Sequence, residues 1–250
     1  VKKGKLKLNK QSFMLLLMMV PGIVYLVINN YIPMVGIMLA FKKYDYSKGM
    51  WDSPWTGFSN FTYLFQTKDA YIMIRNTLLY NVAFIFLGTV LAVAIAVLLN
   101  EIRNDRMKKL YQVLILIPYL ISMVVVSYVV YAFLSSDSGL INNLLGKEPP
   151  INWHTKKEAW PYILVFVHLW KTFGYSSIIY YATIIGIDKE IYEAATVDGA
   201  NRLQKIWHVT IPGIRLTVIT MVLLAIGRIF RSDFGLFYQV PQNSGLLSDV

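Results

Sequence analysis

The sequence contains no cysteine and only three histidines, His154, His168 and His208, which lie far apart along the chain. Without cysteine, disulfide bonds and cysteine-based metal or redox sites are excluded, and the redox compartment is left open. No two histidines have the H-x-x-x-H spacing that places both on one face of a helix. We therefore expect no metal site.

The chain also lacks the short motifs of common enzyme classes. A Walker A loop requires G-x-x-x-x-G-K-[ST], whereas "GLINNLLGKE", which begins at Gly139, has six residues between its glycines and Glu148 after Lys147. The G-x-S-x-G and H-E-x-x-H patterns are also missing from the sequence. We expect a protein that is not an enzyme, does not hydrolyse ATP and binds no cofactor directly.

Charge is scarce and hydrophobic residues are abundant. Charged residues make up 15% of the chain and hydrophobic residues 56%, with a mean hydropathy of +0.50. This composition is typical of membrane proteins. The net charge of +10 does not indicate nucleic acid, because lysines and arginines are divided among short connectors rather than gathered on one soluble face. We expect anionic lipid headgroups as the partner of these charges, and no nucleic acid.

Five apolar segments approach or exceed the roughly 20 helical residues that cross a bilayer. They cover residues 13–41, 78–99, 113–134, 160–185 and 211–230. None shows the polar face with a period near 3.6 that a soluble bundle requires. The first could be a cleaved signal peptide, but its apolar run is long and no A-x-A site follows, so we interpret it as a retained helix. The sequence predicts an all-α polytopic membrane protein.

The segments between the spans predict the organisation and orientation of the chain. We expect a basic tail at residues 1–12, a first transmembrane helix at 13–41, an extracytoplasmic segment at 42–74 and a core membrane domain at 75–250. Lysine and arginine slightly favour the side of the N-terminus, which we place in the cytoplasm. The opposite connectors are rich in Trp, Tyr, Gly, Pro and Asn, which suits either interfacial anchoring or docking of an extracytoplasmic partner.

One polar stretch, "EAATVDGANRLQKIWHVTIP" from Glu193 to Pro212, separates the last two apolar segments. Apolar residues at helical spacing before and after Asp198-Gly199 predict two short amphipathic helices joined by a sharp turn. We expect Asp198 to cap the second helix, Gly199 to form the turn and Pro212 to lie in the first turn of the next span. Such a segment suits insertion into a groove on another protein, or a position along the membrane surface.

This stretch resembles the EAA loop of permease subunits of ATP-binding-cassette (ABC) importers, whose pattern is E-A-A, three residues, G, nine residues, I-x-L-P. Glu193, Ala194, Ala195, Gly199 and Pro212 match, while Val209 and Ile211 replace the usual Ile and Leu. The surrounding "WKTFGYSSIIYYATIIGIDKEIYEAATVDGANRLQKIWHVTIPGI" and "YIPMVGIMLAFKKY" are similar to the oligosaccharide branch, near its aldouronate-type group. Leu216 stands where a second proline is common, and the expected sixth helix would lie beyond Val250.

The resemblance implies the transmembrane domain of a type I importer in a bacterial cell membrane. Its partners would be a second permease subunit, giving a heterodimer, two cytoplasmic ATPases that use ATP and magnesium, an extracytoplasmic solute-binding protein and a carbohydrate solute. The EAA loop, residues 186–212, would be the coupling helix seated on an ATPase. The residues that it assigns to coupling are Glu193, Ala194, Ala195, Asp198, Gly199, Ala200, Leu203, Trp207 and Pro212.

Polar and aromatic groups within the spans are candidates for the solute path. Charges inside a membrane are expensive, and sugars need both aromatic faces and hydrogen-bonding groups. Our candidates are Trp170, Lys171, Tyr175, Tyr180 and Arg228. Lys171 could equally pair with a partner subunit, and Arg228 could extend to lipid headgroups or pair with Asp233. The alternatives to a sugar permease are a peptide or amino-acid permease and, in another class, an intramembrane transferase or a channel.

Overall fold

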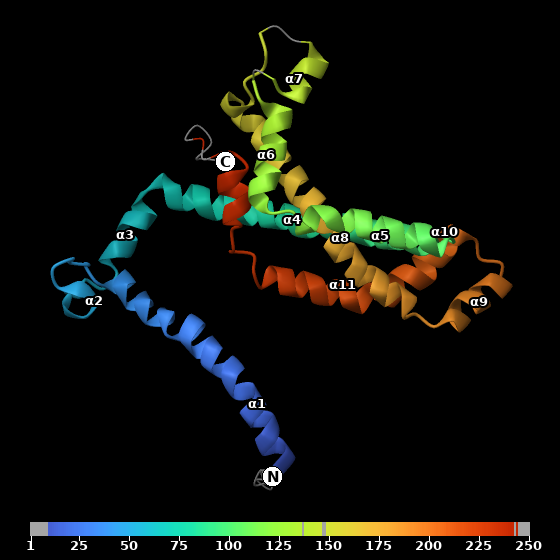
Figure 1. Ribbon diagram of the computed structural model, residues 1–250, viewed down its shortest axis with the longest axis horizontal. Coiled ribbons are helices and arrows are strands. Elements are labelled where there is room, and N and C mark those ends of the chain that lie inside the picture. Colours follow the sequence, from blue (N-terminus) through green and yellow to red (C-terminus); the bar gives the residue numbers. More distant parts are fainter. Residues whose placement is uncertain (1–9, 137, 147–148, 243, 245–250) are drawn as a thin grey trace. The chain divides into compact units, whose positions relative to one another are not determined.

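The computed structural model describes residues 10–136, 138–146, 149–242 and 244 of the 250-residue chain (Figure 1). The regular elements of these described residues are helices, accompanied by one isolated antiparallel bridge between Lys42 and Trp55. The chain divides into two compact units, Val1–Tyr71 and Ile72–Val250. The basic tail predicted at residues 1–12 lies mostly outside the described residues.

Unit 1 begins with one long apolar helical run, Phe13–Phe41. It consists of α1 (Lys10–Leu26), the π-helical turn η1 (Val27–Tyr31) and the 3₁₀ helix η2 (Pro33–Phe41), followed by the short helices α2 (Gly49–Asp52) and α3 (Ser59–Gln66). The π turn falls at Asn29-Asn30, where the Asn29 side chain donates to the carbonyl of Tyr25, 3.0 Å away. No residue in the most apolar part of this run is buried within the structure, as expected of a helix solvated by lipid.

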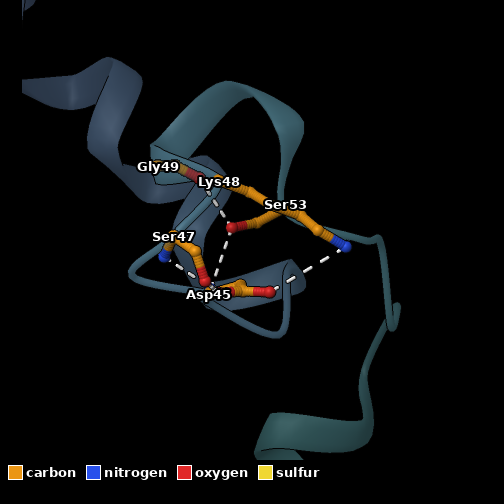
Figure 2. Close-up of polar contacts among 5 residues, drawn as sticks. All are labelled: Asp45, Ser47, Lys48, Gly49 and Ser53. Carbon is orange, nitrogen blue, oxygen red and sulfur yellow. Dashed lines mark hydrogen bonds and ion pairs between the residues drawn. The ribbon is translucent and has the colours of Figure 1, made fainter.

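The loop between η2 and α3 is held by polar contacts around Asp45 (Figure 2). Both the backbone N–H and the hydroxyl of Ser47 donate to the Asp45 carboxylate, at 2.9 and 2.6 Å. These bonds favour the charged form and lower the pKa of Asp45. The Ser53 hydroxyl accepts from the Asp45 N–H and donates to the carbonyl of Gly49, while Lys48 lies 3.9 Å from the carboxylate. The loop is therefore ordered by its own hydrogen bonds.

Unit 2 carries most of α4 and every later helix. In chain order these are α4 (Lys68–Glu101), α5 (Asp105–Leu120), α6 (Met123–Leu134), α7 (Leu140–Leu145), η3 (Trp153–Thr155), η4 (Lys157–Ala159), α8 (Trp160–Ile185), α9 (Lys189–Val197), α10 (Arg202–Lys205), η5 (Ile206–Thr210), α11 (Ile211–Ile226) and η6 (Gly235–Gln239). Helix α8 has the bounds predicted for the fourth apolar segment, whereas α4 begins ten residues before the predicted second one.

The third predicted span, residues 113–134, is broken into two helices. Helices α5 and α6 are bent by 94° relative to each other. The sharp change of direction between them is visible in Figure 1. Ile121 and Ser122 are extended at the break, with ψ of 136° and 151°, and the Ser122 hydroxyl oxygen accepts from the N–H of Val125 to start α6. The described residues contain four helices long and apolar enough to cross a membrane, and a fifth span only if this bent pair counts as one.

Two buried clusters hold unit 2 together. One lies where α4, α6, α8 and η6 meet and includes Tyr80, Val126, Trp160, Leu164 and Leu236. The other lies where α4, α8 and α11 meet. Its buried members are Ala92, Ala96, Val97, Tyr180, Ile184 and Ile214. Since α4 and α8 contribute to both clusters, these two helices form the centre of the unit.

The α7 connector, residues 135–160, links α6 to α8 and is organised by Asn142. This side chain is buried, and its amide donates to the carbonyls of Ser135 and Ile151 at 3.1 and 2.9 Å. Its oxygen accepts from the N–H of Ile151 at 3.3 Å. The indole of Trp160 is also buried and donates to the carbonyl of Trp153 at 3.0 Å. The connector thus satisfies many polar groups of its own loop.

Candidate functional site

The α9–α10 segment, residues 186–212, follows the C-terminus of α8. Asp188 caps α9 by accepting from the N–H of Glu190 at 3.0 Å. At the other end, the N–H groups of Gly199 and Ala200 donate to the carbonyls of Thr196 and Ala195, at 3.1 and 2.9 Å. These two bonds are those of a Schellman motif, and Gly199 has the positive φ, 79°, that the motif needs. A Cβ on Gly199 would meet no atom within 4 Å, so backbone conformation rather than space requires glycine here.

Asn201, not Asp198, caps the second short helix. The Asn201 side chain accepts from the N–H of Gln204 at 2.9 Å, and the Gln204 side chain accepts from the N–H of Asn201 at 2.7 Å. This reciprocal pair is a capping box. The expected capping role of Asp198 was wrong, because Asp198 is the C-cap of α9. The capping residue of α10 is Asn201, three residues later.

No interruption separates this second helix from the next span. The run Arg202–Ile226 is continuous through α10, η5 and α11. Pro212 lies in the first turn of α11, as predicted. The preceding π turn has the N–H of Ile211 bonded to the carbonyl of Ile206, which places one wide turn directly before the proline. α10 and α11 therefore belong to one helical run.

Two contacts of α9, and one of Ile187 just before it, fix the segment against this continuous run. The hydroxyls of Tyr192 and Thr210 are hydrogen bonded at 2.9 Å, and the Lys205 ammonium donates to the Thr196 hydroxyl at 2.9 Å. Ile187 packs so closely on Gly213 that a Cβ there would lie 2.5 Å from the Ile187 Cδ1 atom. The segment is therefore one folded body rather than a mobile loop.

Apolar side chains on this body remain uncovered. Val197, Leu203 and Trp207 have exposed fractions of 87%, 67% and 64%, and Glu193 and Ala194 are exposed as well. Beside them lies a hollow of about 290 Å³. Its lining residues are Ala195, Asp198, Gly199, Ala200, Gln204, Lys205, His208 and Val209. All nine residues predicted for coupling thus belong to this body, whose apolar side chains and hollow can receive another molecule.

A larger cavity of about 860 Å³ lies among α4, α5, α8, α11 and the residues that follow α11. Its lining combines amide, hydroxyl, aromatic and charged groups, which include Asn81, Phe84, Thr89, Tyr119, His168, Thr172, Ser176, Tyr180, Arg228, Arg231, Ser232 and Asp233. Phe84 and His168 stack with ring centroids 3.8 Å apart. Such a mixture can bind a ligand that has both hydroxyl groups and flat apolar faces.

Of the five residues predicted for the solute path, Tyr180 and Arg228 line this cavity and Trp170, Lys171 and Tyr175 are not among its lining residues. Tyr175 stacks on Tyr119, which does line it. Lys171 donates to backbone carbonyls at the end of α5. Within the described residues, neither Arg228 nor Arg231 forms an ion pair with Asp233, whose carboxylate accepts instead from the N–H of Gly235 at 2.9 Å.

Sequence reasoning missed the contribution of α4 to the cavity. Asn81, Gly88 and Thr89 were visible as polar or small interruptions of an apolar run, and all three line the cavity. Asn81 also donates to the carbonyl of Arg231 at 3.4 Å. A polar residue within a span is a signal for a functional position, and applying that rule to α4 as well as α8 would have found it.

The structure combines helices long and apolar enough to span a membrane, a cavity among them and an exposed segment joined to the cavity wall. This combination defines a transport subunit of the permease class. Residues 85–232 match the family described as binding-protein-dependent transport system inner membrane component. The chain belongs to this family, and its all-helical fold is that of a type I ABC importer permease.

Individual relatives agree with this assignment. Protein LplB of Bacillus subtilis is 33% identical over 233 residues, covering 92% of this chain and 73% of the relative. The polygalacturonan/rhamnogalacturonan transport system permease protein YteP of the same organism is 37% identical, covering 90% and 71%. A crystal structure of a bacterial ABC transporter involved in the import of the acidic polysaccharide alginate superimposes with a TM-score of 0.84 at 31% identity, covering 96% of this chain and 82% of that one.

Proposed function

We propose that the chain is the permease subunit of an ATP-driven importer and forms half of the path for an oligosaccharide. One observation carries the proposal: the continuous helix Arg202–Ile226 connects the exposed apolar body of the α9–α10 segment to the wall of the 860 Å³ cavity. A partner that moves the exposed end therefore moves Met221 and Ala225 at the cavity. Family membership supports the proposal over a transferase or a channel. Relatives named for transport of carbohydrates favour it over a peptide permease.

The partner at the α9–α10 segment is a cytoplasmic ATPase, which binds ATP and magnesium in place of this chain. Leu203 and Trp207 enter a groove of that ATPase, and the Glu193 carboxylate faces donors there. When two ATPases close on bound ATP, they move the two α9–α10 segments of the permease pair. The cavity, which was open to one side of the membrane, then opens to the other. Because both sites bias one equilibrium, ATP and solute influence each other's binding.

The remaining assembly follows from the family and the orientation of the charges. A second, different permease completes the path, and an extracytoplasmic solute-binding protein delivers the solute. A solved alginate transporter was crystallised in complex with a pentasaccharide-bound periplasmic protein, which supports such a delivery partner. In this proposal the N-terminus and the α9–α10 segment lie on the cytoplasmic side of a bacterial cell membrane, which the slight excess of lysine and arginine on that side supports.

The cavity lining favours an oligosaccharide that carries carboxylates. Aromatic rings of Phe84 and Tyr180 can stack on sugar faces, and Asn81 can bond hydroxyls. Arg228 and Arg231 bring two cations that no described carboxylate pairs. Relatives named for transport of polygalacturonan or rhamnogalacturonan, diacetylchitobiose and arabinooligosaccharides support a carbohydrate.

The coupling proposal is tested by Gly199→Asp in the intact complex purified from membranes. We expect the chain to accumulate while copurification of the ATPase or solute-stimulated ATP hydrolysis is lost, because the new side chain projects where the partner packs. The matched control is Gly146→Asp, since Gly146 also ends a helix with positive φ and open space around its Cβ position. Native copurification and hydrolysis in Gly199→Asp would contradict the proposal.

The solute proposal is tested by Arg228→Gln, assayed by uptake into proteoliposomes that contain the complex. We expect KM for an acidic oligosaccharide to rise several-fold while KM for a neutral one of equal length stays constant. Arg103→Gln is the control, because Arg103 is exposed and far from the cavity lining. Equal effects on both solutes would show that Arg228 does not recognise a carboxylate.

A further inference from the structure

The 94° break between α5 and α6 leaves backbone groups without helical partners. The last carbonyls of any helix have no N–H one turn further on to accept from, and the extended residues Ile121 and Ser122 provide none here. Unpaired carbonyls are costly inside a membrane, where water is not available to bond them. Something else must satisfy the end of α5.

Lys171 of α8 supplies the missing donors. Its ammonium donates to the carbonyl of Pro118 at 3.3 Å, to that of Tyr119 at 3.2 Å and, by a shorter contact, to that of Ile121. An ammonium has three N–H donors, so these three acceptors use its full capacity. A positive charge is also favourable at a helix C-terminus, where the peptide dipoles concentrate negative charge. The cation is thus fully engaged with backbone of its own chain.

Two further contacts join α8 to α5 close to Lys171. At Gly174 the helices approach so closely that a Cβ would overlap the carbonyl oxygen of Ile115. One residue later, the ring of Tyr175 stacks on that of Tyr119, with centroids 4.6 Å apart and planes 11° from parallel. Lys171, Gly174 and Tyr175 therefore fix the end of α5 from within little more than one turn of α8.

Tyr119 connects this arrangement to the cavity. Tyr119 lines the 860 Å³ cavity, and its carbonyl is one of the three to which Lys171 donates. A shift of the α5 end would move the Tyr119 ring relative to Ser176 on α8, which lines the same cavity. The position of one wall residue thus depends on a lysine that is not among the lining residues.

We propose that Lys171 is a positioning residue: it clamps the broken end of α5 and thereby sets the place of Tyr119 in the cavity wall. It acts through Tyr119 rather than by touching the solute. Its contribution to transport is therefore independent of solute charge. The transport consequence rests on the proposed function, whereas the geometric claim does not.

Cysteine labelling tests the geometric claim, because the sequence has no cysteine of its own. Tyr119→Cys and, separately, Ser176→Cys are introduced, and the rate of maleimide labelling is measured on this chain in the assembled complex in proteoliposomes. We expect Lys171→Met to change labelling of the thiol at position 119 several-fold relative to labelling of the thiol at position 176. Lys171→Arg should restore the native ratio, since a guanidinium can also donate to several carbonyls. Lys156→Met, at an exposed lysine, should leave the ratio unchanged.

Uptake provides the second readout, with Lys171→Met made in the chain that retains Tyr119. We expect a several-fold lower maximal rate, nearly constant KM and the same loss for neutral and acidic oligosaccharides, with partial recovery in Lys171→Arg. An unchanged labelling ratio would overturn the proposal, and so would a rise in KM confined to acidic solutes, which would make Lys171 a solute contact. If the unmodified complex transports no oligosaccharide, the proposed function fails while the labelling ratio still decides the role of Lys171.

Discussion

The two connectors at the ends of α8, the α7 connector and the α9–α10 segment, differ in what they bury. The α7 connector is organised around the buried side chains of Asn142 and Trp160, which donate to its own carbonyls, although Leu144 of α7 is exposed. The α9–α10 segment is also hydrogen bonded, but neither α9 nor α10 has a buried residue, and Leu203 and Trp207 are uncovered. Order without burial indicates a surface built for a partner, whereas order with burial indicates a structural element. Substitutions in the two connectors should therefore fail in different assays.

The largest effect on the chain itself is expected for Asn142→Leu in the α7 connector. The substitution leaves the carbonyl of Ile151 and its N–H without their partner, and each buried group left unpaired costs about 1 to 3 kcal/mol. Thermal unfolding of the purified complex should begin at a clearly lower temperature. Asn143→Leu is the matched control, because Asn143 is exposed and makes only a 3.4 Å bond to Ser138. Equal unfolding temperatures for the two variants would refute the structural role of Asn142.

Trp207→Ser in the α9–α10 segment should give the reverse pattern. Since the indole is exposed, the stability of the chain should change by no more than about 0.5 kcal/mol. Loss of an aromatic anchor from an interface costs about 2 kcal/mol or more, so ATPase copurification should fall strongly. Tyr162→Ser, at an even more exposed aromatic near the start of α8, should leave copurification intact. A destabilised chain with native ATPase binding would reverse the contrast between the connectors.

Asn201→Ala tests whether the order of the exposed segment matters in itself. The variant loses the capping box at the start of α10, which is worth about 1 kcal/mol, without touching an exposed apolar side chain. The affinity for the ATPase should weaken moderately, because α10 would be less ordered in the free subunit and would have to adopt its bound conformation on binding. Asn201→Asp, which retains an acceptor for the Gln204 N–H, should recover most of the affinity. An affinity unaffected by Asn201→Ala would mean that preorganisation of this helix contributes nothing.

The smallest effect is expected for Tyr192→Phe. It removes only the hydroxyl that bonds Thr210 at 2.9 Å, a contribution of about 1 kcal/mol or less. Assembly should persist, while the ratio of solute transported to ATP hydrolysed should fall slightly because α9 is held less firmly on the α11 run. Thr196→Val, which removes the contact with Lys205 on the same body, should act in the same direction. If Tyr192→Phe impaired assembly more than Asn201→Ala does, the expected order of these two effects would be wrong.

The sequence was sufficient to predict elements that local signals determine. The unbroken apolar run of α8 set its bounds, and Asp198-Gly199 marked the turn that the positive φ of Gly199 requires. The choice of cap was less secure, because Asp198 and Asn201 are both good capping residues and only the hydrogen-bond geometry separates them.

Long-range contacts limited the prediction elsewhere. The carbonyls at the break after Leu120 are bonded by Lys171, about fifty residues later in the chain, and no local pattern reveals this contact. The cavity has the same difficulty, since Asn81 and Tyr180 meet only after α4 and α8 have packed. A span that is apolar all round also gives no indication of which face turns toward a cavity.

The turn at Gly199 has a mechanical consequence. A Schellman motif closes α9 and a capping box opens α10, with only Ala200 between Gly199 and the capping residue Asn201. A pliable connector would absorb a push from outside as local bending and deliver little of it. A turn held by hydrogen bonds on both sides acts as a rigid joint, so that a force applied to α9 is transmitted to α10. The efficiency of energy transfer then depends on the stiffness of a few backbone hydrogen bonds.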